Sequence, residues 1–430
     1  SETGEAGVKY VKDNQIELYF NNNKKLETTN TGAVVTGICT ATSFSGSGEG
    51  LTRTTQLSHR NIIINGAMLV AQRGTSSTSA GYQTVDRISQ GFANVNENPT
   101  CGQSNVGAPS SPYNLPTSGD HPYKEGFRKT YYVGNGNQTT AAGANQDMSF
   151  YYNIEAQDLV GSGWNFADPS SYLTISFWVK ASISQTYYVG FRLYGPSNGN
   201  QREYCFNFTP AAPFEWTKVT HSIPGHASNT LREDNELGAF IQFVQYWGTN
   251  YTSSGRVNEA WQAKNNNSNY PDMSGNYYNQ NDASYQITGL QLEVGQQATP
   301  FEHRSFTEEL TRCYRYYRRF GANGALPTPA VYNRLSIGYA PSSSVVRYPF
   351  QLDPPMRINP VNSNFSNSGN FNIQPGSLGS GSFSCDDLAS SANMMIVKLD
   401  NTSVTAGTGA AVSLHHNNDA TAYMDISAEI

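Results

Sequence analysis

The sequence predicts an all-β protein that is built from several sandwich-like domains. Short stretches of alternating or β-branched residues recur along its 430 residues, and clusters of Gly, Asn, Pro and Ser separate them. Aromatic residues make up 12% of the chain, which is too many for a disordered protein, so sizeable cores are expected. Many short strands joined by turns are typical of β-sandwiches and barrels. Strands are predicted at residues 15–20, 172–180, 187–194, 203–208, 216–222, 239–246, 285–294, 334–339, 394–399 and 422–426.

Residues 1–57 form the first predicted region, a short N-terminal segment. It holds two strand-like pieces at 16–20 and 34–38, a turn-rich NNNKK stretch after the first piece, and the flexible linker GSGEG at 46–50. A segment of this size has too little apolar area to fold alone. We therefore expect it to pair with copies of itself or with another chain, and a trimeric stalk is the simplest arrangement.

Residues 58–303 form the main predicted β region, and its clearest strand is 172–180. Every second residue of that strand is apolar, so these side chains share one core-facing side: Leu173, Ile175, Phe177 and Val179. Long loops rich in Asn, Gly and Tyr are predicted at 94–123, 195–202 and 250–283. Trp178 and Trp216 belong to strands, and we assign both to packing.

Residues 304–322 hold the one convincing helix. Ser305 and Glu308 fit a capping box, and Leu310 and Cys313 follow at helical spacing. The segment 315–320 (RYYRRF) is also rich in aromatic strand formers, so we expect the helix to extend only to about Tyr314. The residues after it could already form the first strand of the next domain. Residues 323–430 are again strands and turns, and we expect a C-terminal β-sandwich there.

The composition excludes several classes of partner and site. The net charge is −6 and the longest basic cluster is Arg318-Arg319, which is no footprint for nucleic acid or an anionic membrane. No stretch approaches the roughly 20 apolar residues of a transmembrane helix. The five cysteines are scattered and form no C-x-x-C pair, which argues against a zinc site and favours free thiols. They are Cys39, Cys101, Cys205, Cys313 and Cys385.

An ordered set of motifs resembles the fibre proteins of bacteriophages. NIIINGAM at 61–68, AQRG at 71–74 and VDR at 85–87 look like the start of the carbohydrate-binding-module-like jelly roll that such fibres carry. The set continues with ISFWVKAS at 175–182, EWTKV at 215–219, ITGLQLEVG at 287–295, ATPFE at 298–302, EEL at 308–310 and CYRYY at 313–317. Outside this region, GVKY at 7–10, ELYF at 17–20 and VVTG at 34–37 are similar to fibre stalk repeats, and PMR at 355–357 and DISAE at 425–429 to the C-terminal sandwich.

The resemblance implies a homotrimeric virion fibre with an N-terminal stalk, a jelly roll from 58 to 303, a linking helix and a C-terminal sandwich. Related jelly rolls often hold a structural calcium through an acidic residue after the first turn and another in the last strand. This chain has Met68-Leu-Val70 and Thr288-Gly289 at those places, so we expect no metal. No cofactor is expected either.

An enzyme needs a constellation of reactive groups, and the sequence contains none of the common motifs. Fibre depolymerases cut glycans with paired carboxylates, so the only candidates are Glu233-Asp234-Glu236 and Asp386-Asp387. Adjacent carboxylates on a polar loop are usually only solvated. His415-His416 is expected to face solvent rather than to bind a metal. We therefore predict that the chain is not an enzyme.

Glycan binding has better support, because sugars stack on aromatic rings and hydrogen-bond with Asn, Gln, Asp and Tyr. Aromatic residues near Asn, Gly or Ser are the candidates: Trp164, Trp247, Tyr251, Trp261, Tyr270, Tyr277 and Tyr278. The densest patch runs from WGTNY at 247–251 through NNNSNYP at 265–271 to Tyr278. The equally weighted alternative is that these rings pin long loops or fill a trimer interface.

The sequence thus predicts a non-enzymatic adhesin of the virion, made in the host cytoplasm, that binds a bacterial surface polysaccharide as a homotrimer. Its N-terminal segment is expected to join other virion proteins of the tail or capsid. Two alternatives stay open. One is a purely structural fibre without receptor contact, and the other, less favoured, is a glycan-depolymerising tailspike.

Overall fold

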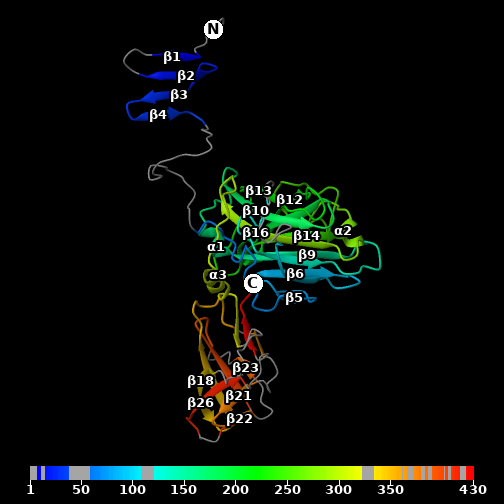
Figure 1. Cartoon of the computed structure of the whole chain (residues 1–430), viewed down its shortest axis with the longest axis vertical. Coiled ribbons are helices and arrows are strands. Elements are labelled where there is room, and N and C mark those ends of the chain that lie inside the picture. Colours follow the sequence, from blue (N-terminus) through cyan, green and yellow to red (C-terminus); the bar gives the residue numbers. More distant parts are fainter. Residues whose placement is uncertain are drawn as a thin grey trace. The chain divides into compact units, whose positions relative to one another are not determined.

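The protein is represented by a computed structural model that describes residues 7–10, 15–37, 59–107, 121–321, 334–360, 362–365, 371–378, 383–385, 390–400, 402–404, 408–416 and 423–430. Strands dominate these residues, and the α-helices among them are short: α1 (Ala156–Val160), α2 (Asn276–Asn279) and α3 (Phe306–Cys313). The predicted all-β fold class is therefore confirmed (Figure 1). None of the described helices is long and apolar enough to cross a membrane. The chain divides into two compact units, Ser1–Thr54 and Thr55–Ile430.

The N-terminal unit is a four-stranded antiparallel meander, drawn in blue in Figure 1. Its strands are β1 (Val8–Tyr10), β2 (Ile16–Phe20), β3 (Asn23–Thr29) and β4 (Gly32–Val35). Asn21 and Asn22 join β2 to β3 with φ values of 49° and 55°. Two positive φ angles in a two-residue loop match the twist of a hairpin, and Asn tolerates that conformation.

The two faces of this meander differ in character. Glu17 lies on one face, where its carboxylate accepts hydrogen bonds from Tyr19 (2.7 Å) and Lys24 (3.3 Å). The opposite face carries Ile16 and Leu18, which pair in register with residues of β1 and β3. Large apolar side chains of this unit are exposed rather than packed: Val8, Tyr10, Ile16, Leu18, Phe20, Val34 and Val35.

The second unit begins with a jelly-roll sandwich of two six-stranded antiparallel sheets (Figure 1). The first sheet has the order β13 (Thr217–Pro224), β10 (Tyr172–Ala181), β16 (Ser284–Val294), β8 (Lys129–Gly134), β7 (Thr100–Asn105) and β5 (Ser76–Ser77). The second sheet has the order β15 (Gln262–Ala263), β12 (Arg202–Phe208), β11 (Tyr187–Leu193), β14 (Leu237–Trp247), β9 (Asp147–Glu155) and β6 (Ile88–Ala93).

The core lies between these sheets and follows from the alternation within their strands. In β10 the predicted inward set is confirmed, since Leu173, Ile175, Phe177 and Val179 are all buried in one cluster. From the facing sheet, Phe243 stacks on Phe150 with ring centroids 4.9 Å apart. Trp178 is buried on the other side of β10, beyond a bulge, and Trp216 packs partly against the same small cluster.

One predicted loop is corrected by the structure. Residues 94–123 were expected to be a loop, but Thr100–Asn105 form β7 between β8 and β5. The sequence TCGQSN consists of small and polar residues that usually mark turns. It is a strand because it pairs with β5 on one side and β8 on the other, and no local sequence pattern reveals that pairing.

The link to the C-terminal part agrees closely with the prediction. Helix α3 starts after Ser305, whose hydroxyl accepts a hydrogen bond from the Glu308 backbone N–H (3.2 Å), and it ends at Tyr314. The next residues form β17 (Tyr317–Gly321), the first strand of the following sandwich. Among the cysteines, Cys101, Cys205 and Cys313 are buried free thiols. Cys39 lies outside the described residues.

The C-terminal sandwich is made of three antiparallel sheets around a core of its own. One has the order β17, β27 (Tyr423–Ser427) and β20 (Asn362–Phe365). The largest has the order β21 (Phe371–Gln374), β26 (Ala411–His416), β18 (Arg334–Ser342), β19 (Val345–Gln351), β24 (Met394–Asp400) and β23 (Phe383–Cys385), and the third pairs β22 (Ser377–Leu378) with β25 (Thr402–Ser403). His415 was expected to face solvent, but it is buried because β26 is an inner strand of its sheet.

A buried arginine joins the two sandwiches of this unit. The Arg87 guanidinium stacks on the Tyr316 ring, 3.4 Å from its centroid, and donates to the Asn153 carbonyl oxygen (2.7 Å). It also pairs with the Glu429 carboxylate, which a second arginine, Arg73, contacts at 3.2 Å. Since a buried charge without a partner is strongly unfavourable, this pairing fixes the C-terminal segment against the jelly roll.

We expect Glu429→Gln to lower the free energy of unfolding of the second unit by about 3 kcal/mol, because it leaves the Arg87 charge buried and unpaired. Urea denaturation of the full chain measures the change. Lys398→Gln is the control, since the Lys398–Asp400 pair is half-exposed (3.0 Å) and should contribute less than about 1 kcal/mol. Equal losses of unfolding free energy in the two variants would contradict the larger stabilisation expected from the buried pair.

Candidate functional site

The structure divides the seven aromatic residues predicted to bind glycans into two groups. Five of them pack inside the protein, which agrees with the alternative of structural packing: Trp164, Trp261, Tyr270, Tyr277 and Tyr278. Their polar atoms are largely engaged there, as when the Trp261 indole donates to the Pro224 carbonyl oxygen (2.6 Å). No ring face of these five is presented to a ligand at the surface.

Gly190 explains how Tyr270 becomes buried although it lies in a long polar loop. A Cβ atom at Gly190 would lie 2.1 Å from the Tyr270 hydroxyl, so only a glycine leaves room for this ring on the outer face of β11. The hydroxyl donates to the Gln242 side chain (2.9 Å) on the adjacent β14. The loop therefore covers part of the second sheet, and Tyr270 serves as its anchor.

Trp247 and Tyr251 are the two predicted residues that stay half-exposed. Trp247 ends β14, and its ring meets the Tyr251 ring edge to face with centroids 5.6 Å apart. Tyr270 holds the Trp247 ring from the buried side at 5.4 Å. The pair thus forms a supported aromatic surface at the rim of the sandwich.

Asp147 lies directly beside this pair. It opens β9, where it is the register partner of Trp247, and its side chain is half-buried. Burial raises the pKa of Asp147 to about 6, and no hydrogen bond or ion pair to a described residue offsets that effect. A carboxylate that lacks a partner is available to accept hydrogen bonds from a ligand. We call Asp147, Trp247 and Tyr251 the rim site.

A second aromatic group lies on the outer face of the same sheet, where the loop does not cover it. Tyr151 of β9 and Tyr194, which follows β11, are half-exposed, and their rings lie 6.2 and 6.1 Å from that of Phe240. The Arg192 guanidinium stacks on Phe240 at 4.5 Å. Sequence reasoning missed Tyr151, although the alternation of DMSFYYNIE in β9 would have placed it opposite the core.

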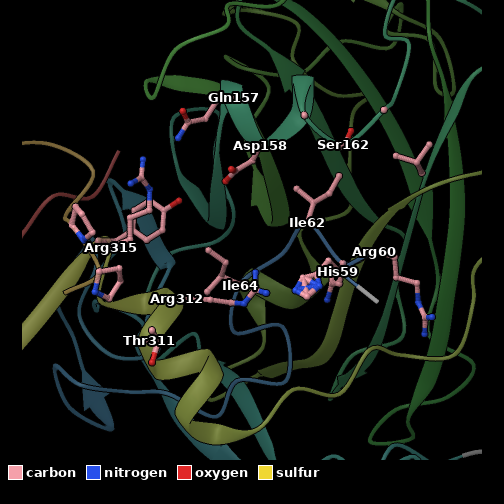
Figure 2. A pocket seen from close by; sticks show the side chains of 17 residues that line it. His59, Arg60, Ile62, Ile64, Gln157, Asp158, Ser162, Thr311, Arg312 and Arg315 are labelled. Atoms are coloured by element: carbon pink, nitrogen blue, oxygen red, sulfur yellow. The ribbon is translucent and has the colours of Figure 1, made fainter. Parts of the chain in front are cut away.

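A cleft lies at the other end of the jelly roll, beside α3. Its volume is about 950 Å³. Its walls come from residues 59–64, α1 with the turn after it, residues 311–316, and Pro354-Pro355 of the C-terminal sandwich. Figure 2 shows Gln157, Asp158 and Ser162 on one side of the cleft and Thr311, Arg312 and Arg315 on another. No predicted site residue lines it.

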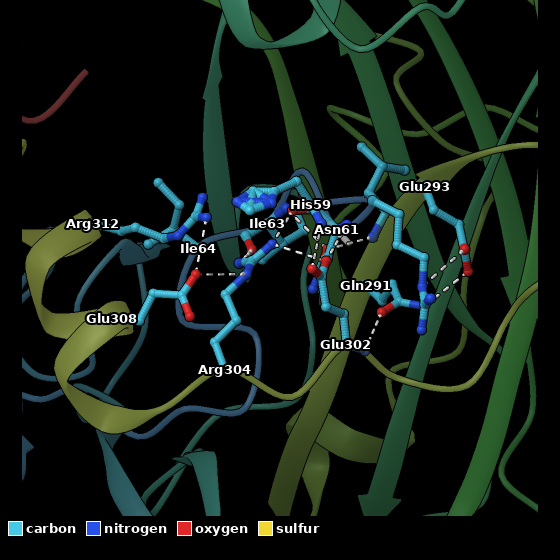
Figure 3. Close-up of polar contacts among 12 residues, drawn as sticks. His59, Asn61, Ile63, Ile64, Gln291, Glu293, Glu302, Arg304, Glu308 and Arg312 are labelled. Atoms are coloured by element: carbon cyan, nitrogen blue, oxygen red, sulfur yellow. Dashed lines mark hydrogen bonds and ion pairs between the residues drawn. The ribbon is translucent and has the colours of Figure 1, made fainter. Parts of the chain in front are cut away.

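The wall formed by residues 59–64 is held in place by Arg304. Its buried guanidinium donates to the carbonyl oxygens of Asn61 and Ile63, and it contacts the carboxylates of Glu302 (3.2 Å) and Glu309 (3.4 Å). Glu302 in turn accepts the backbone N–H groups of His59 and Asn61 (Figure 3). Nothing in the sequence pattern marks these long-range contacts, so sequence reasoning did not find the cleft.

Most charged residues around the cleft are arginines that form ion pairs with glutamates. Arg315 makes a two-pronged contact with Glu155 (2.7 and 2.8 Å), and Arg312 contacts Glu308 at 3.1 Å. Asp158 projects from α1 into the cleft, where desolvation and the nearby Glu155 raise its pKa to about 6. It is the single carboxylate among the described lining residues, so the cleft lacks the carboxylate pair of a glycosidase.

The other carboxylates considered for catalysis are placed as follows. Asp234 pairs with Arg232 at 2.6 Å on an exposed loop, and Glu236 contacts Arg357 at 3.4 Å. Asp386 and Asp387 lie outside the described residues. Within the described part of the chain, no group of three or more His, Cys, Asp or Glu residues is arranged to hold a metal ion. At the positions considered for calcium, Met68 and Thr288 are fully buried.

Comparisons with known proteins gave matches among solved structures alone. No family model matches the sequence, and no curated protein matches it. The enzymatically active domain of tailspike protein 4 of bacteriophage CBA120 is similar over 55% of this chain, with 10% identity and a TM-score of 0.28, and the match spans about a fifth (21%) of that chain. The family 11 carbohydrate-binding module of a Clostridium thermocellum cellulosomal cellulase is similar over 52% of this chain and 96% of the module (12% identity, TM-score 0.24).

A putative sugar-binding protein from Bacteroides thetaiotaomicron is also similar, over 55% of this chain and all of that chain (10% identity, TM-score 0.26). At such identities and TM-scores these similarities carry no inference about what this chain binds. The candidate sites therefore depend on their own geometry.

Asp147 gives a direct test of the rim site. Because burial raises its pKa from 3.8 to about 6, its carboxyl destabilises the fold increasingly as the pH rises from about 4 to about 6, and the full penalty remains at higher pH. Asp147→Asn should therefore raise the free energy of unfolding at pH 8 by roughly 1 kcal/mol and leave it nearly unchanged at pH 4. Urea denaturation at the two pH values measures this difference.

Asp168→Asn is the matched control with the opposite sign. Hydrogen bonds from Ser170 lower the pKa of Asp168, so its ionised form stabilises the fold and the amide should lower stability at pH 8. If both variants shifted stability in the same direction at pH 8, the environment assigned to Asp147 would be wrong.

Proposed function

We propose that this chain is a non-enzymatic adhesin of a bacteriophage fibre, which binds a polysaccharide on the bacterial surface. The observation that carries the proposal is the rim site, where a half-exposed aromatic pair lies beside the Asp147 carboxylate, which has no partner among the described residues. Sugar rings present apolar C–H faces that stack on aromatic rings, and their hydroxyl groups donate hydrogen bonds to carboxylates. The rim site supplies both kinds of contact.

The energetics of Asp147 also support a binding role. An unpaired, half-buried carboxylate with a raised pKa costs folding free energy at neutral pH, and such groups concentrate at functional sites. The outer-face aromatic residues Tyr151 and Tyr194 belong to the same sheet. A saccharide longer than one unit would find further stacking surfaces there.

The functional unit is proposed to be a homotrimer, and the N-terminal meander supports this. Residues Ile16 and Leu18 on its apolar face are exposed, as are Val8 and Tyr10 of the neighbouring strand. An isolated sheet with one uncovered apolar face is not expected to be stable in water. Second and third copies of the same face would cover it, and three copies of a weak glycan site would give avidity. The same N-terminal segment is proposed to join other virion proteins.

Trp247→Ala, Tyr251→Ala and Asp147→Asn should each weaken binding to host cells or to purified surface glycan by about tenfold, because each removes one stacking or hydrogen-bonding contact. Glycan arrays and whole-cell binding with the full chain measure the effect. Phe214→Ala is the control, since Phe214 is an exposed aromatic residue of the jelly roll outside the rim site. Unchanged binding in all three rim variants would overturn this assignment.

Light scattering should give three times the chain mass of 47.0 kDa for the purified protein. Ile16→Asp combined with Leu18→Asp should shift the mass toward that of the monomer, because buried charges at the apolar face are costly. Lys25→Glu, at an exposed position of β3, should leave the trimer intact. A monomeric mass for the unaltered chain at working concentration would rule the trimer out.

A further inference from the structure

We propose that the cleft beside α3 is a second binding site, which takes a saccharide unit that carries a carboxylate or phosphate group. The cleft shares no residue with the rim site, so this proposal does not depend on the proposed function there. Its volume of about 950 Å³ is within the range of small-ligand sites and leaves room for one or two sugar rings.

Charge is the first argument. Four basic side chains line the cleft, against one carboxylate, although the whole chain has a net charge of −6. The basic residues are His59, Arg60, Arg312 and Arg315, and the carboxylate is that of Asp158. The three arginines pair with Glu293, Glu308 and Glu155. None of these glutamates lines the cleft, so basic groups outnumber acidic ones in the lining itself.

Arg312 and Arg315 keep N–H donors that make no hydrogen bond to a described residue. Arg315 uses its Nε and one terminal nitrogen on Glu155, and Arg312 uses one terminal nitrogen on Glu308. A guanidinium carries five N–H donors, so each arginine retains some that make no hydrogen bond to a described residue. Their fork geometry suits the planar carboxylate of a uronic acid or the oxygens of a phosphate. The ion pairs with Glu155 and Glu308 position these donors in advance.

The remaining lining suits the apolar face of a sugar. Ile62 and Ile64 lie between the labelled polar residues in Figure 2. Tyr316, Pro354 and Pro355 add further apolar surface to the lining. The segment that carries Ile62 and Ile64 is fixed by the Arg304 contacts (Figure 3), so the site is largely formed before a ligand arrives.

Asp158 makes the site responsive to pH. The charged groups that act on it are Glu155 on its own segment and Arg87, Arg312 and Arg315 from the elements packed against α1, and His59 lines the same cleft. Below about pH 6 the Asp158 carboxyl takes up a proton, which removes the one negative charge from the lining. Binding of an anionic saccharide should therefore strengthen as the pH falls.

Calorimetry with the full chain tests the site with oligogalacturonate, its carboxyl-reduced neutral form, and inorganic phosphate as probes. We expect oligogalacturonate to bind at least tenfold more tightly than the reduced form, and the difference to shrink between 50 and 300 mM NaCl. Arg312→Gln should abolish this preference, whereas Arg128→Gln, on an arginine stacked on Tyr123 outside the cleft, should retain it. Asp158→Asn should bind at pH 7.5 as tightly as the unaltered chain does at pH 5.5.

Equal affinity for the acidic and reduced oligosaccharides would overturn the proposal, as would an Arg312→Gln variant that keeps the preference. Phosphate that binds as tightly as oligogalacturonate would overturn the assignment to a saccharide. Trp247→Ala separates this site from the rim site, because it should leave oligogalacturonate binding unchanged. Loss of oligogalacturonate binding in Trp247→Ala would place the acidic ligand at the rim site and refute the cleft as its binding site. If the rim variants left glycan binding unchanged but Arg312→Gln abolished the preference for oligogalacturonate, the rim site alone would be refuted.

Discussion

The Arg304 guanidinium is the contact on which the second unit most depends. It binds two main-chain carbonyl oxygens of the first jelly-roll segment, those of Asn61 and Ile63. It also contacts two carboxylates, that of Glu302 before α3 and that of Glu309 within it. One of these, Glu309, also accepts the backbone N–H of Asn65 (2.6 Å). The start of the sandwich and the helix are thus joined at one internal cation, where oxygen atoms of this kind would otherwise suit a hard metal ion. The cleft wall and the direction of α3 both follow from it.

The extent to which the sequence predicts this fold depends on how local the determining pattern is. Alternation in β10 and the capping box of Ser305 are local signals, and both elements were placed within a residue or two. Strand β7 has no such signal, because its small polar residues become a strand only through their neighbours in the sheet. The C-terminal region shows the same limit, since the burial of His415 depends on which strands flank it.

The sites were harder to predict than the strands, for a related reason. Composition directed attention to the loop aromatic residues, but whether such a ring faces solvent is decided by a distant residue, as Gly190 decides it for Tyr270. Asp147 is unremarkable in the sequence and acquires its raised pKa only through burial next to Trp247. The cleft brings together segments more than 200 residues apart, and no spacing rule detects that arrangement.

The contacts of Arg87 and Arg73 with Glu429 have a consequence for how such a protein can be recombined. The chain leaves the jelly roll at α3, builds the C-terminal sandwich, and returns in β27 so that Glu429 and the Ile430 carbonyl oxygen lie against residues of the jelly roll. A chimaera that exchanged one sandwich alone would break these pairs and leave arginine charges buried. Exchange of the two sandwiches together keeps every partner, so they form a single cassette for the design of hybrid proteins.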